Sequence, residues 1–354
     1  MRIRRKFTLL TAALAASLPA VAVAPGAAHA AAAVVVRLPI PVAVGADVVA
    51  AGDREFISGG YGTSQIAVAD AAGAIVATID GLPGPTDLAL SNDRRTLFVA
   101  LPAANAIAAF DTGSLAETAR YDTGAEGGCP AHLAPAGRYL WFGYGCTPGT
   151  GDIGHVDLRR QPARTTLGLA GATYFYDAPA VASALRNPGV LLAGETGSSP
   201  AEIHSFTVAG GRLTEVSSTR ELGSNLGDLA LDPAGSTAFT ASGAPYHFPS
   251  VPAGDLNAPG LNYQAQPYPV AVEVSREGGK LAGGINGIYE PDVYFYTIGN
   301  PAPLATYEVG QGYHLLNGAL AWAPNGRRAY AVSTDRDYEP STTAELHVIP
   351  APAA

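Results

Sequence analysis

Four aspartates are the first candidates for functional residues, and each lies shortly before a short apolar stretch. They are Asp47, Asp87, Asp177 and Asp228. Carboxylates gathered around a common axis could bind a cation or a cationic ligand. Alternatively, each could accept hydrogen bonds from backbone N–H groups of the turn that it begins, as aspartate often does. The residue types allow both interpretations.

Three tyrosines lie in glycine-rich segments and form a second candidate set. Tyr61 follows Gly59-Gly60, Tyr246 lies in the segment 243–248, and Tyr289 lies in the segment 286–290. Rigid aromatic tips on pliable glycine loops make good contact surfaces for a sugar, a peptide or a protein. Loops of this composition are also what a chain of short strands needs at its turns, so a binding role and a purely structural role both stay open.

Local catalytic motifs are missing from the chain. It contains no His-Glu-x-x-His, no Gly-x-Ser-x-Gly, no phosphate-binding loop and no dinucleotide fingerprint. We therefore expect no metal site and no cofactor, and we assign no catalytic residue. An enzyme whose site residues come from separate segments would show no local motif, and its possible members are Glu195, Glu290, Glu339, His247 and His314.

The charge balance excludes one class of partner. The chain carries 21 Lys and Arg against 30 Asp and Glu, a net charge of -9, and has no basic run after residue 6. Nothing here would neutralise a phosphate backbone, so nucleic acid is not expected as a partner. An acidic chain favours a cationic or neutral polar ligand over an anion.

The N-terminus has the pattern of a secretory signal peptide. A basic start is followed by an apolar run from Phe7 to about Ala24, and small residues at 28 and 30 predict cleavage after Ala30. The segment Arg4-Arg5-Lys6-Phe7 fits either ordinary secretion or twin-arginine export. Cleavage would remove four positive charges and take the net charge from -9 to -13. No other segment is apolar enough to span a membrane, so we expect a secreted, monomeric protein.

Cys129 and Cys146 are the only cysteines. An even count in an exported chain favours a disulfide. A turn at residues 135–138 would fold the flanking segments into a hairpin in which 129 lies opposite 146. Nearby His132 is interpreted as a polar strand residue rather than as a partner in metal or redox chemistry.

The elements that must position these residues recur along the chain. A short apolar stretch, a turn, a second apolar stretch and an alternating stretch repeat about every 40 to 50 residues. The seven units begin near Asp47, Asp87, Pro130, Asp177, Asp228, Val270 and Ala319. Three or four short strands per unit, with no convincing helix, predict an all-β fold, a single seven-bladed β-propeller of four-stranded antiparallel blades.

The chain ends supply the closure of this ring. The last unit ends after its third strand, while an unmatched strand at residues 34–40 precedes the first unit. We predict that residues 34–40 pair with 344–349 and close the ring. The expected organisation is a signal peptide at 1–30, the propeller at 31–350 and a short tail at 351–354.

The repeated segments resemble a known family. Asp87-Leu88-Ala89-Leu90, Leu97-Phe98-Val99-Ala100 and Ile107-Ala108-Ala109-Phe110-Asp111 resemble the YVTN-type, YncE-like propeller repeats, which are cousins of WD40 repeats. No unit carries a clean Tyr-Val-Thr-Asn tetrapeptide. The resemblance implies a propeller fold and no particular activity, since propellers host many functions.

In a propeller, the starts of the inner strands and the loops between second and third strands emerge on one side of the disc. We therefore expect the four aspartates and the three tyrosines to share one face, opposite a face of tight hairpins with little concave surface. The expected function is a non-catalytic binding or scaffold propeller for an unknown protein or polar ligand. The alternative is a channel-centred hydrolase, lactonase or lyase.

Overall fold

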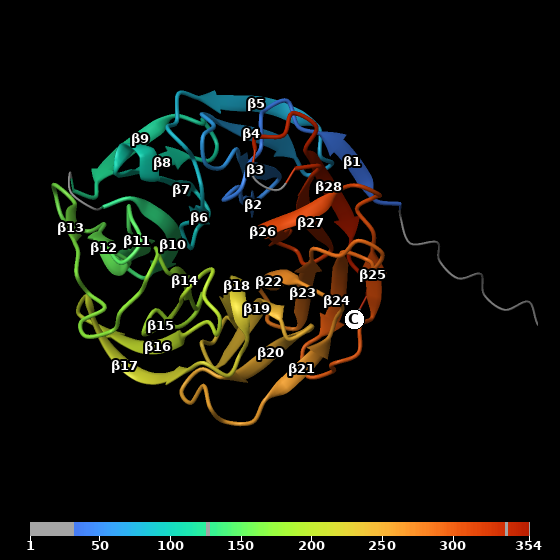
Figure 1. Ribbon diagram of the computed structural model, residues 1–354. Helices are drawn as coiled ribbons and strands as arrows, with labels where there is room; N and C mark the ends of the chain where they lie inside the picture. The colour runs from blue at the N-terminus through green and yellow to red at the C-terminus, as the bar shows by residue number, and fades with distance from the viewer. Residues whose placement is uncertain (1–31, 125–127, 337–338, 354) are drawn as a thin grey trace, which may run out of the picture. The chain divides into compact units, whose positions relative to one another are not determined.

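The protein is a seven-bladed β-propeller. The structure, a computed structural model, describes residues 32–124, 128–336 and 339–353, so the predicted signal peptide lies outside the described residues. Seven four-stranded antiparallel sheets follow one another around a central axis (Figure 1). The predicted all-β fold and blade count are confirmed. Within the described residues, no helix has the length and apolar character needed to cross a membrane.

In each blade the first strand named is the inner one, nearest the axis, and the last is the outer one. The first three blades contain Val48–Ala51 (β2), Arg54–Ser58 (β3), Gln65–Asp70 (β4) and Ile75–Asp80 (β5); Leu88–Leu90 (β6), Thr96–Leu101 (β7), Ala106–Asp111 (β8) and Glu117–Asp122 (β9); Pro130–Ala136 (β10), Tyr139–Tyr144 (β11), Asp152–Asp157 (β12) and Arg164–Thr166 (β13). The fourth and fifth contain Ala180–Ser183 (β14), Val190–Gly194 (β15), Ile203–Ala209 (β16) and Arg212–Thr219 (β17); Ser224–Leu231 (β18), Thr237–Ala244 (β19), His247–Pro252 (β20) and Leu261–Gln264 (β21). The last two contain Pro269–Val274 (β22), Lys280–Ile285 (β23), Val293–Thr297 (β24) and Ala305–Tyr307 (β25); His314–Trp322 (β26), Arg328–Thr334 (β27), Glu345–Pro350 (β28) and Val34–Arg37 (β1). In the described part of the chain, one 3-10 turn, Pro102–Ala104 (η1), joins β7 to β8.

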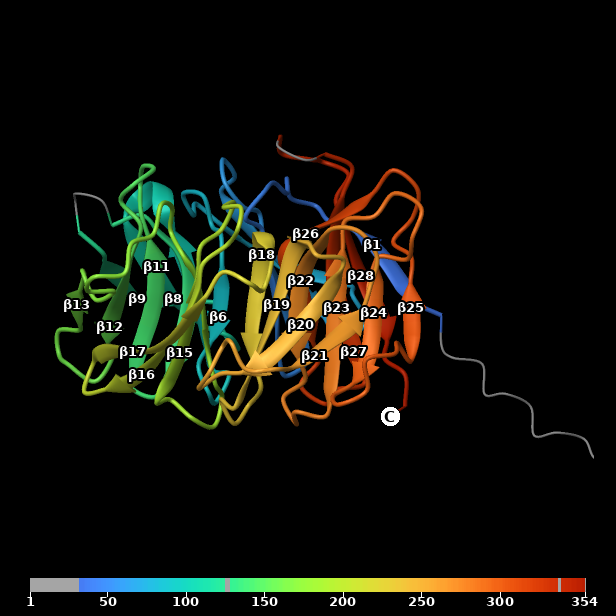
Figure 2. The same ribbon diagram turned by 60° about the horizontal axis from the view of Figure 1, so that its bottom comes forward.

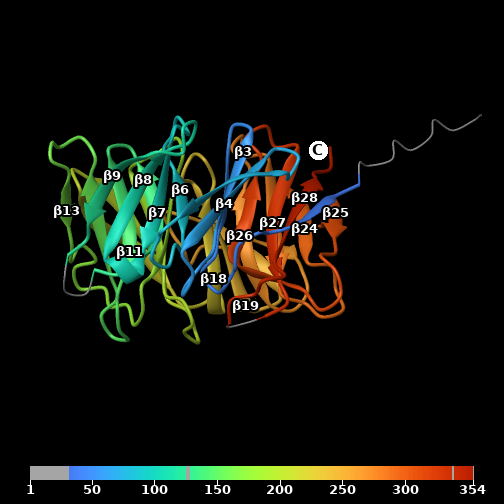
Figure 3. The same ribbon diagram turned by 90° about the horizontal axis from the view of Figure 1, so that it is seen from above.

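Antiparallel order divides the loops between two faces of the ring (Figure 2; Figure 3). The connection face carries the loops between second and third strands and the links between blades. Its described segments are 38–47, 59–64, 81–87, 102–105, 123–124, 128–129, 145–151, 167–179, 195–202, 220–223, 245–246, 265–268, 286–292, 308–313, 335–336 and 339–344. The hairpin face carries the turns between first and second strands and those between third and fourth strands. These turns are 52–53, 71–74, 91–95, 112–116, 137–138, 158–163, 184–189, 210–211, 232–236, 253–260, 275–279, 298–304 and 323–327.

The core lies between the blades rather than inside any one of them. Val48 and Ile57 of the first blade, for example, belong to one buried cluster with Val332 and Leu346 of the last blade. A single four-stranded sheet would leave its faces in water, so each blade gains most of its buried apolar area from its neighbours.

The ring is closed by strand pairing between the two ends of the chain. β1 pairs with β28 in antiparallel register, with Val34 opposite Val348 and Arg37 opposite Glu345. This pairing confirms the predicted closure, although the strand is shorter than the predicted 34–40. It ends at Arg37, after which the Leu38 N–H donates to the Ala344 carbonyl (2.9 Å). The chain then turns inward and buries three apolar side chains, Leu38 (3% exposed), Ile40 (2%) and Val42 (0%).

The two cysteines form the predicted disulfide, with their Cα atoms 5.1 Å apart. The predicted register holds from His132 to Ala136, and it is wrong by one residue only at the cysteine end of the hairpin. A bulge between Pro130 and His132 shifts the hairpin, so that the Gly145 N–H, not a group of Cys146, donates to the Cys129 carbonyl. The bridge still forms because cysteines in adjacent positions of a hairpin end remain within disulfide reach.

Shortening the chain from its N-terminus tests the closure. Chains that begin at Ala31, Leu38 and Ala43 should form a graded series. The second lacks only the β1 pairing and exposes the β28 edge, so its melting temperature should fall. The third also loses three buried side chains, each of which contributes about 2 to 4 kcal/mol, and should unfold at much lower denaturant concentration or fail to fold. Equal melting temperatures for the first two chains would contradict the closure role of β1.

Removing the disulfide tests its contribution to stability. The bridge closes a loop with a sequence separation of 17. Replacing both cysteines by serine should therefore lower the free energy of unfolding by roughly 3 kcal/mol in the chain-entropy model. Urea unfolding of the double variant measures the loss. Mass spectrometry of a non-reduced digest checks the bond itself, and two thiols that alkylate without reductant would rule it out.

Candidate functional site

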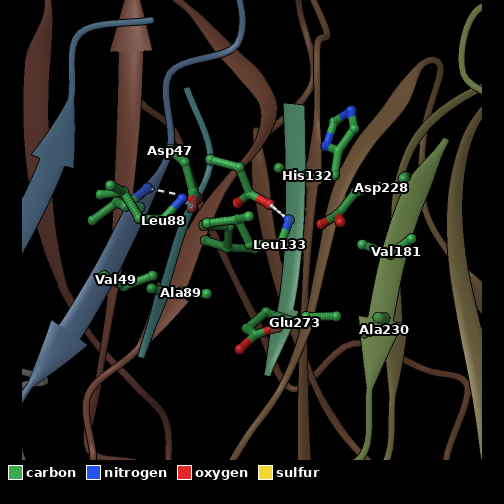
Figure 4. Close-up of a pocket in the computed structure, with 18 of the residues that line it drawn as sticks. Asp47, Val49, Leu88, Ala89, His132, Leu133, Val181, Asp228, Ala230 and Glu273 are labelled. Carbon is green, nitrogen blue, oxygen red and sulfur yellow. Dashed lines mark hydrogen bonds between the residues drawn. The ribbon is translucent and has the colours of Figure 1, made fainter. Parts of the chain in front are cut away.

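A cavity of ≈ 530 Å³ lies on the axis of the ring, and the inner strands of all seven blades contribute to its wall. Figure 4 shows Asp47, His132 and Asp228 toward one end of this cavity and Glu273 toward the other. Small and apolar side chains such as Val49, Ala89 and Ala230 line the wall at about the level of Glu273. The cavity therefore combines a polar end with a wall of mostly small and apolar side chains, which is a common composition for a ligand site.

Three of the predicted aspartates link neighbouring blades at the connection-face end. Asp47 accepts hydrogen bonds from the N–H of Val48 (2.6 Å) and from the N–H of Leu88 (2.9 Å) in the next blade. Asp228 repeats the pattern with Leu229 (2.7 Å) and with Val272 (2.8 Å) in the next blade.

Asp87 completes this pattern by accepting from Leu133 of the third blade. Each of the three carboxyl groups thus accepts a hydrogen bond from an inner-strand N–H group of the next blade. No described strand within that next blade satisfies this donor. The interpretation that these aspartates accept backbone N–H groups is therefore better supported than cation binding. The sequence predicts N–H donors in the aspartate's own turn, and it does not predict the donor in the adjacent blade.

The surroundings of these carboxyl groups disfavour their charge. Burial, and next the charge of Asp87, hold the pKa of Asp47 well above its usual value, and a side-chain hydrogen bond joins the two carboxyl groups. Burial likewise raises the pKa of Asp87, and raises that of Asp228 to about 7. Two carboxyl groups this close cannot both ionise freely, so the charge of Asp87 adds to the effect of burial in raising the pKa of Asp47.

His132 stands in the third blade where the first, second and fifth blades have aspartate, because Leu133 occupies the place of Leu88 and Leu229. Burial lowers the pKa of His132, while the Asp87 charge opposes the shift. From the sequence, His132 is interpreted only as a polar strand residue. Aligning the inner strands on Leu88 would have placed it on the ring, so the signal was present in the repeat.

The opposite end of the cavity combines one acid with two arginines, none of which was a sequence candidate. Burial, and next the charge of Asp228, raise the pKa of Glu273 to about 8. Arg94 donates to the Ala50 carbonyl (3.2 Å), and Arg276 donates to the Asn92 carbonyl (3.3 Å) of a blade across the ring. These arginines come from two different hairpins and narrow this end of the cavity.

Asp177 is not where the sequence analysis placed it. The inner strand β14 begins at Ala180, so Asp177 lies in the link before it and does not line the cavity. Tyr61 lies on the cavity wall. Tyr246 and Tyr289 lie outside the cavity, on connection-face loops, with 49% and 91% of their surfaces exposed.

The five residues considered for a catalytic role do not line the cavity. The Glu195 carboxylate accepts the Tyr176 N–H (2.9 Å), Glu290 accepts the Tyr289 N–H (3.2 Å), and Glu339 pairs with Arg336 (3.2 Å). His247 and His314 begin β20 and β26. Within the described ranges, no group of three or more His, Cys, Asp or Glu side chains has the arrangement of a metal site.

The connection face carries many exposed aromatic side chains and an excess of acidic ones. Its exposed large apolar side chains are Val44, Tyr61, Tyr174, Tyr176, Tyr246, Tyr268, Ile288 and Tyr289. Its described acidic side chains are Asp47, Asp87, Asp177, Glu195, Glu202, Glu221, Glu290, Asp292, Glu308, Asp335 and Glu339. Among the described residues of these segments only Arg220 and Arg336 are cationic, and each is paired with a glutamate.

The hairpin face differs in both respects. Among the described residues of its turns, none is an exposed aromatic side chain, Leu304 (42% exposed) is the one exposed large apolar side chain, and arginines outnumber acidic residues. The expectation that this face lacks concave surface is wrong, because a groove of ≈ 600 Å³ lies between the turns 275–279 and 323–327 and the segment 351–353. Lys280 crosses it and donates to the carbonyl groups of Gly326 (3.3 Å) and Pro352 (2.8 Å), which ties the C-terminal segment to the ring.

No family model matches this chain, and no curated protein matches it in sequence. The YncE-like resemblance therefore stays a prediction. Solved structures do share the fold. A chain of the mitotic checkpoint complex has a TM-score of 0.67 and 14% identity, covering 99% of each chain. A chain of Kuenenia stuttgartiensis hydrazine synthase has a TM-score of 0.64 and 15% identity over 90% of this chain and 98% of that one.

The β-propeller domain of Cps50 (Swd1) from Myceliophteria thermophila is similar at a TM-score of 0.64 and 12% identity, over 91% of this chain and all of that one (100%). Identities this low carry the architecture alone. The chain therefore has a WD40-like seven-bladed propeller fold, and its function must be argued from its own surface.

The raised pKa of Asp228 predicts a specific pH dependence of stability. In the unfolded chain this group titrates near 4, whereas in the fold its pKa is about 7. Between these values the folded state keeps a proton that the unfolded chain loses. The stabilising contribution is thus complete below about pH 4 and is lost as the pH rises through 7.

Asp228→Asn keeps one acceptor oxygen but cannot ionise. The stability of the variant relative to wild type should therefore rise between pH 4.5 and 8.5, by on the order of 2 kcal/mol. Urea unfolding at several pH values measures this difference. The variant Asp53→Asn, at an exposed position, is the matched control. A constant difference between Asp228→Asn and wild type across this range would contradict the buried, protonated state.

Proposed function

We propose that this protein is an exported, non-catalytic binding propeller that holds a protein partner or polar ligand on its connection face. The observation that carries the proposal is the concentration of exposed aromatic side chains on this one face, around the mouth of the axial cavity. Tyrosine supplies a large contact area at low conformational cost and is enriched at interfaces. The Cys129–Cys146 bond and the basic, then apolar N-terminal sequence support export.

The enzyme alternative has weaker support. Oxygens of Asp47, Asp87 and Asp228 already accept inner-strand N–H groups from two blades, which suits fixed structural groups better than a base or nucleophile that must move a proton. The residues considered for a hydrolase, lactonase or lyase are scattered over loops and strand ends outside the cavity. A binding role asks only that the carboxyl groups and tyrosines stay in place.

Site-specific photo-cross-linking tests the proposal. A photoreactive amino acid at position 289 or 246 of the connection face should give light-dependent adducts with components of the medium or envelope of the producing cell. The same group at Gly52 or Asn325 of the hairpin face is the matched control and should give few adducts. Adducts from the hairpin face alone, or none above background from either face, would overturn the proposed function.

A further inference from the structure

The exposed apolar groups of the connection face surround the cavity mouth rather than lying in one loop. Tyr61 belongs to the first blade, Tyr176 to the link before the fourth, Tyr246 to the fifth and Tyr289 to the sixth. Ile288, 80% exposed beside Tyr289, extends the apolar surface. A ligand small enough to fit in ≈ 530 Å³ would contact few of these side chains. Contact with all of them needs a partner as broad as the face, which is the scale of a protein interface.

The charge of the connection face indicates the charge that such a partner carries on its binding surface. Apart from Arg220 and Arg336, the described segments of the face have no cation, and these two are already paired with Glu202 and Glu339. The acids of the rim are therefore in excess and attract a positively charged surface.

At the centre of the rim, Asp87 and Asp228 are held rigid by backbone N–H donors from two blades. A carboxylate has about four lone-pair positions, so each group retains acceptor capacity toward the cavity, and a cation placed beside these carboxyl groups favours their ionised form. The apolar wall below them, with Val49, Ala89 and Ala230, suits the methylene stem of a long cationic side chain.

We propose that the connection face docks a protein partner through a cationic loop, with one arginine or lysine of that loop entering the cavity mouth between Asp47, Asp87 and Asp228. Apolar groups on either side of this residue lie against Tyr61, Tyr246 and Tyr289. This inference rests on the proposed binding function and names the chemistry of the partner.

A displayed library of cyclic peptides, randomised at seven positions, tests the inference with a defined probe. Peptides selected on the wild-type protein at low salt should carry arginine or lysine at one common position. Their affinity should fall at least tenfold for the double variant Asp87→Asn with Asp228→Asn, and several-fold when salt rises from about 20 to 150 mM. The double variant Asp53→Asn with Glu277→Gln removes two exposed charges near the hairpin face and is the matched control, for which affinity should not change.

A second variant protects the test against loss of folding. Tyr289→Ser with Ile288→Ser alters only exposed side chains and should weaken the same peptides without changing the melting temperature. Selected peptides that lack a cation, or cationic ones that bind the asparagine variant equally well, would overturn the inference but leave the binding function standing. Peptides insensitive to both face variants would overturn both.

Sedimentation velocity tests the other possible occupant of the connection face, a second copy of this chain. A second copy could present the arginines of its hairpin face to the acidic connection face, and concentration-dependent association abolished by Tyr289→Ser with Ile288→Ser would assign the face to self-assembly instead. A monomer at all concentrations leaves the face free for the cationic partner.

Discussion

Ring closure is the constraint on which the rest of this structure depends. Seven sheets packed face to face leave no open side only if the last blade meets the first, and here that contact is made without a covalent link, by β1 on β28. The N-terminal segment adds buried Leu38, Ile40 and Val42 at the same place. Every blade buries its faces against two neighbours. Loss of the β1–β28 pairing or of these buried side chains would therefore reduce the apolar burial that stabilises the whole ring.

Close approach of the blades also depends on residues with small side chains and on fixed polar groups. A Cβ atom added to Gly143 in β11 would lie 1.8 Å from the Pro179 carbonyl oxygen in the link to the next blade. On the axis, Asp47, Asp87 and Asp228 accept N–H groups from neighbouring inner strands. An inner strand has no further strand beside it, so these carboxyl groups satisfy donors that would otherwise face an apolar wall.

The same carboxyl groups connect the scaffold to the candidate function. They are half-buried, protonated more readily than free aspartate, and placed where the tyrosine rim meets the cavity. Rigidity required by the fold thus provides a preorganised acidic mouth, and preorganised groups bind at lower entropic cost than mobile ones. The hairpin face, with its short turns and its arginines, has no comparable rim among its described residues.

The sequence alone determined the features that rest on local chemistry. Alternating apolar residues and glycine turns define strands within a few residues, so the seven units, the closing strand and the cysteine hairpin could be recognised from the residues. What only the tertiary structure decided are the contacts between units. The partner of Asp87 is Leu133, 46 residues away in the next blade, and a one-residue bulge displaced the cysteine register. Asp177 begins its unit in sequence but not its inner strand, whereas His132, Glu273 and Arg94 reach the axis without any local motif. Burial and the pKa shifts that follow from it depend on which side chains of distant segments surround a group, and short-range patterns contain no information about that.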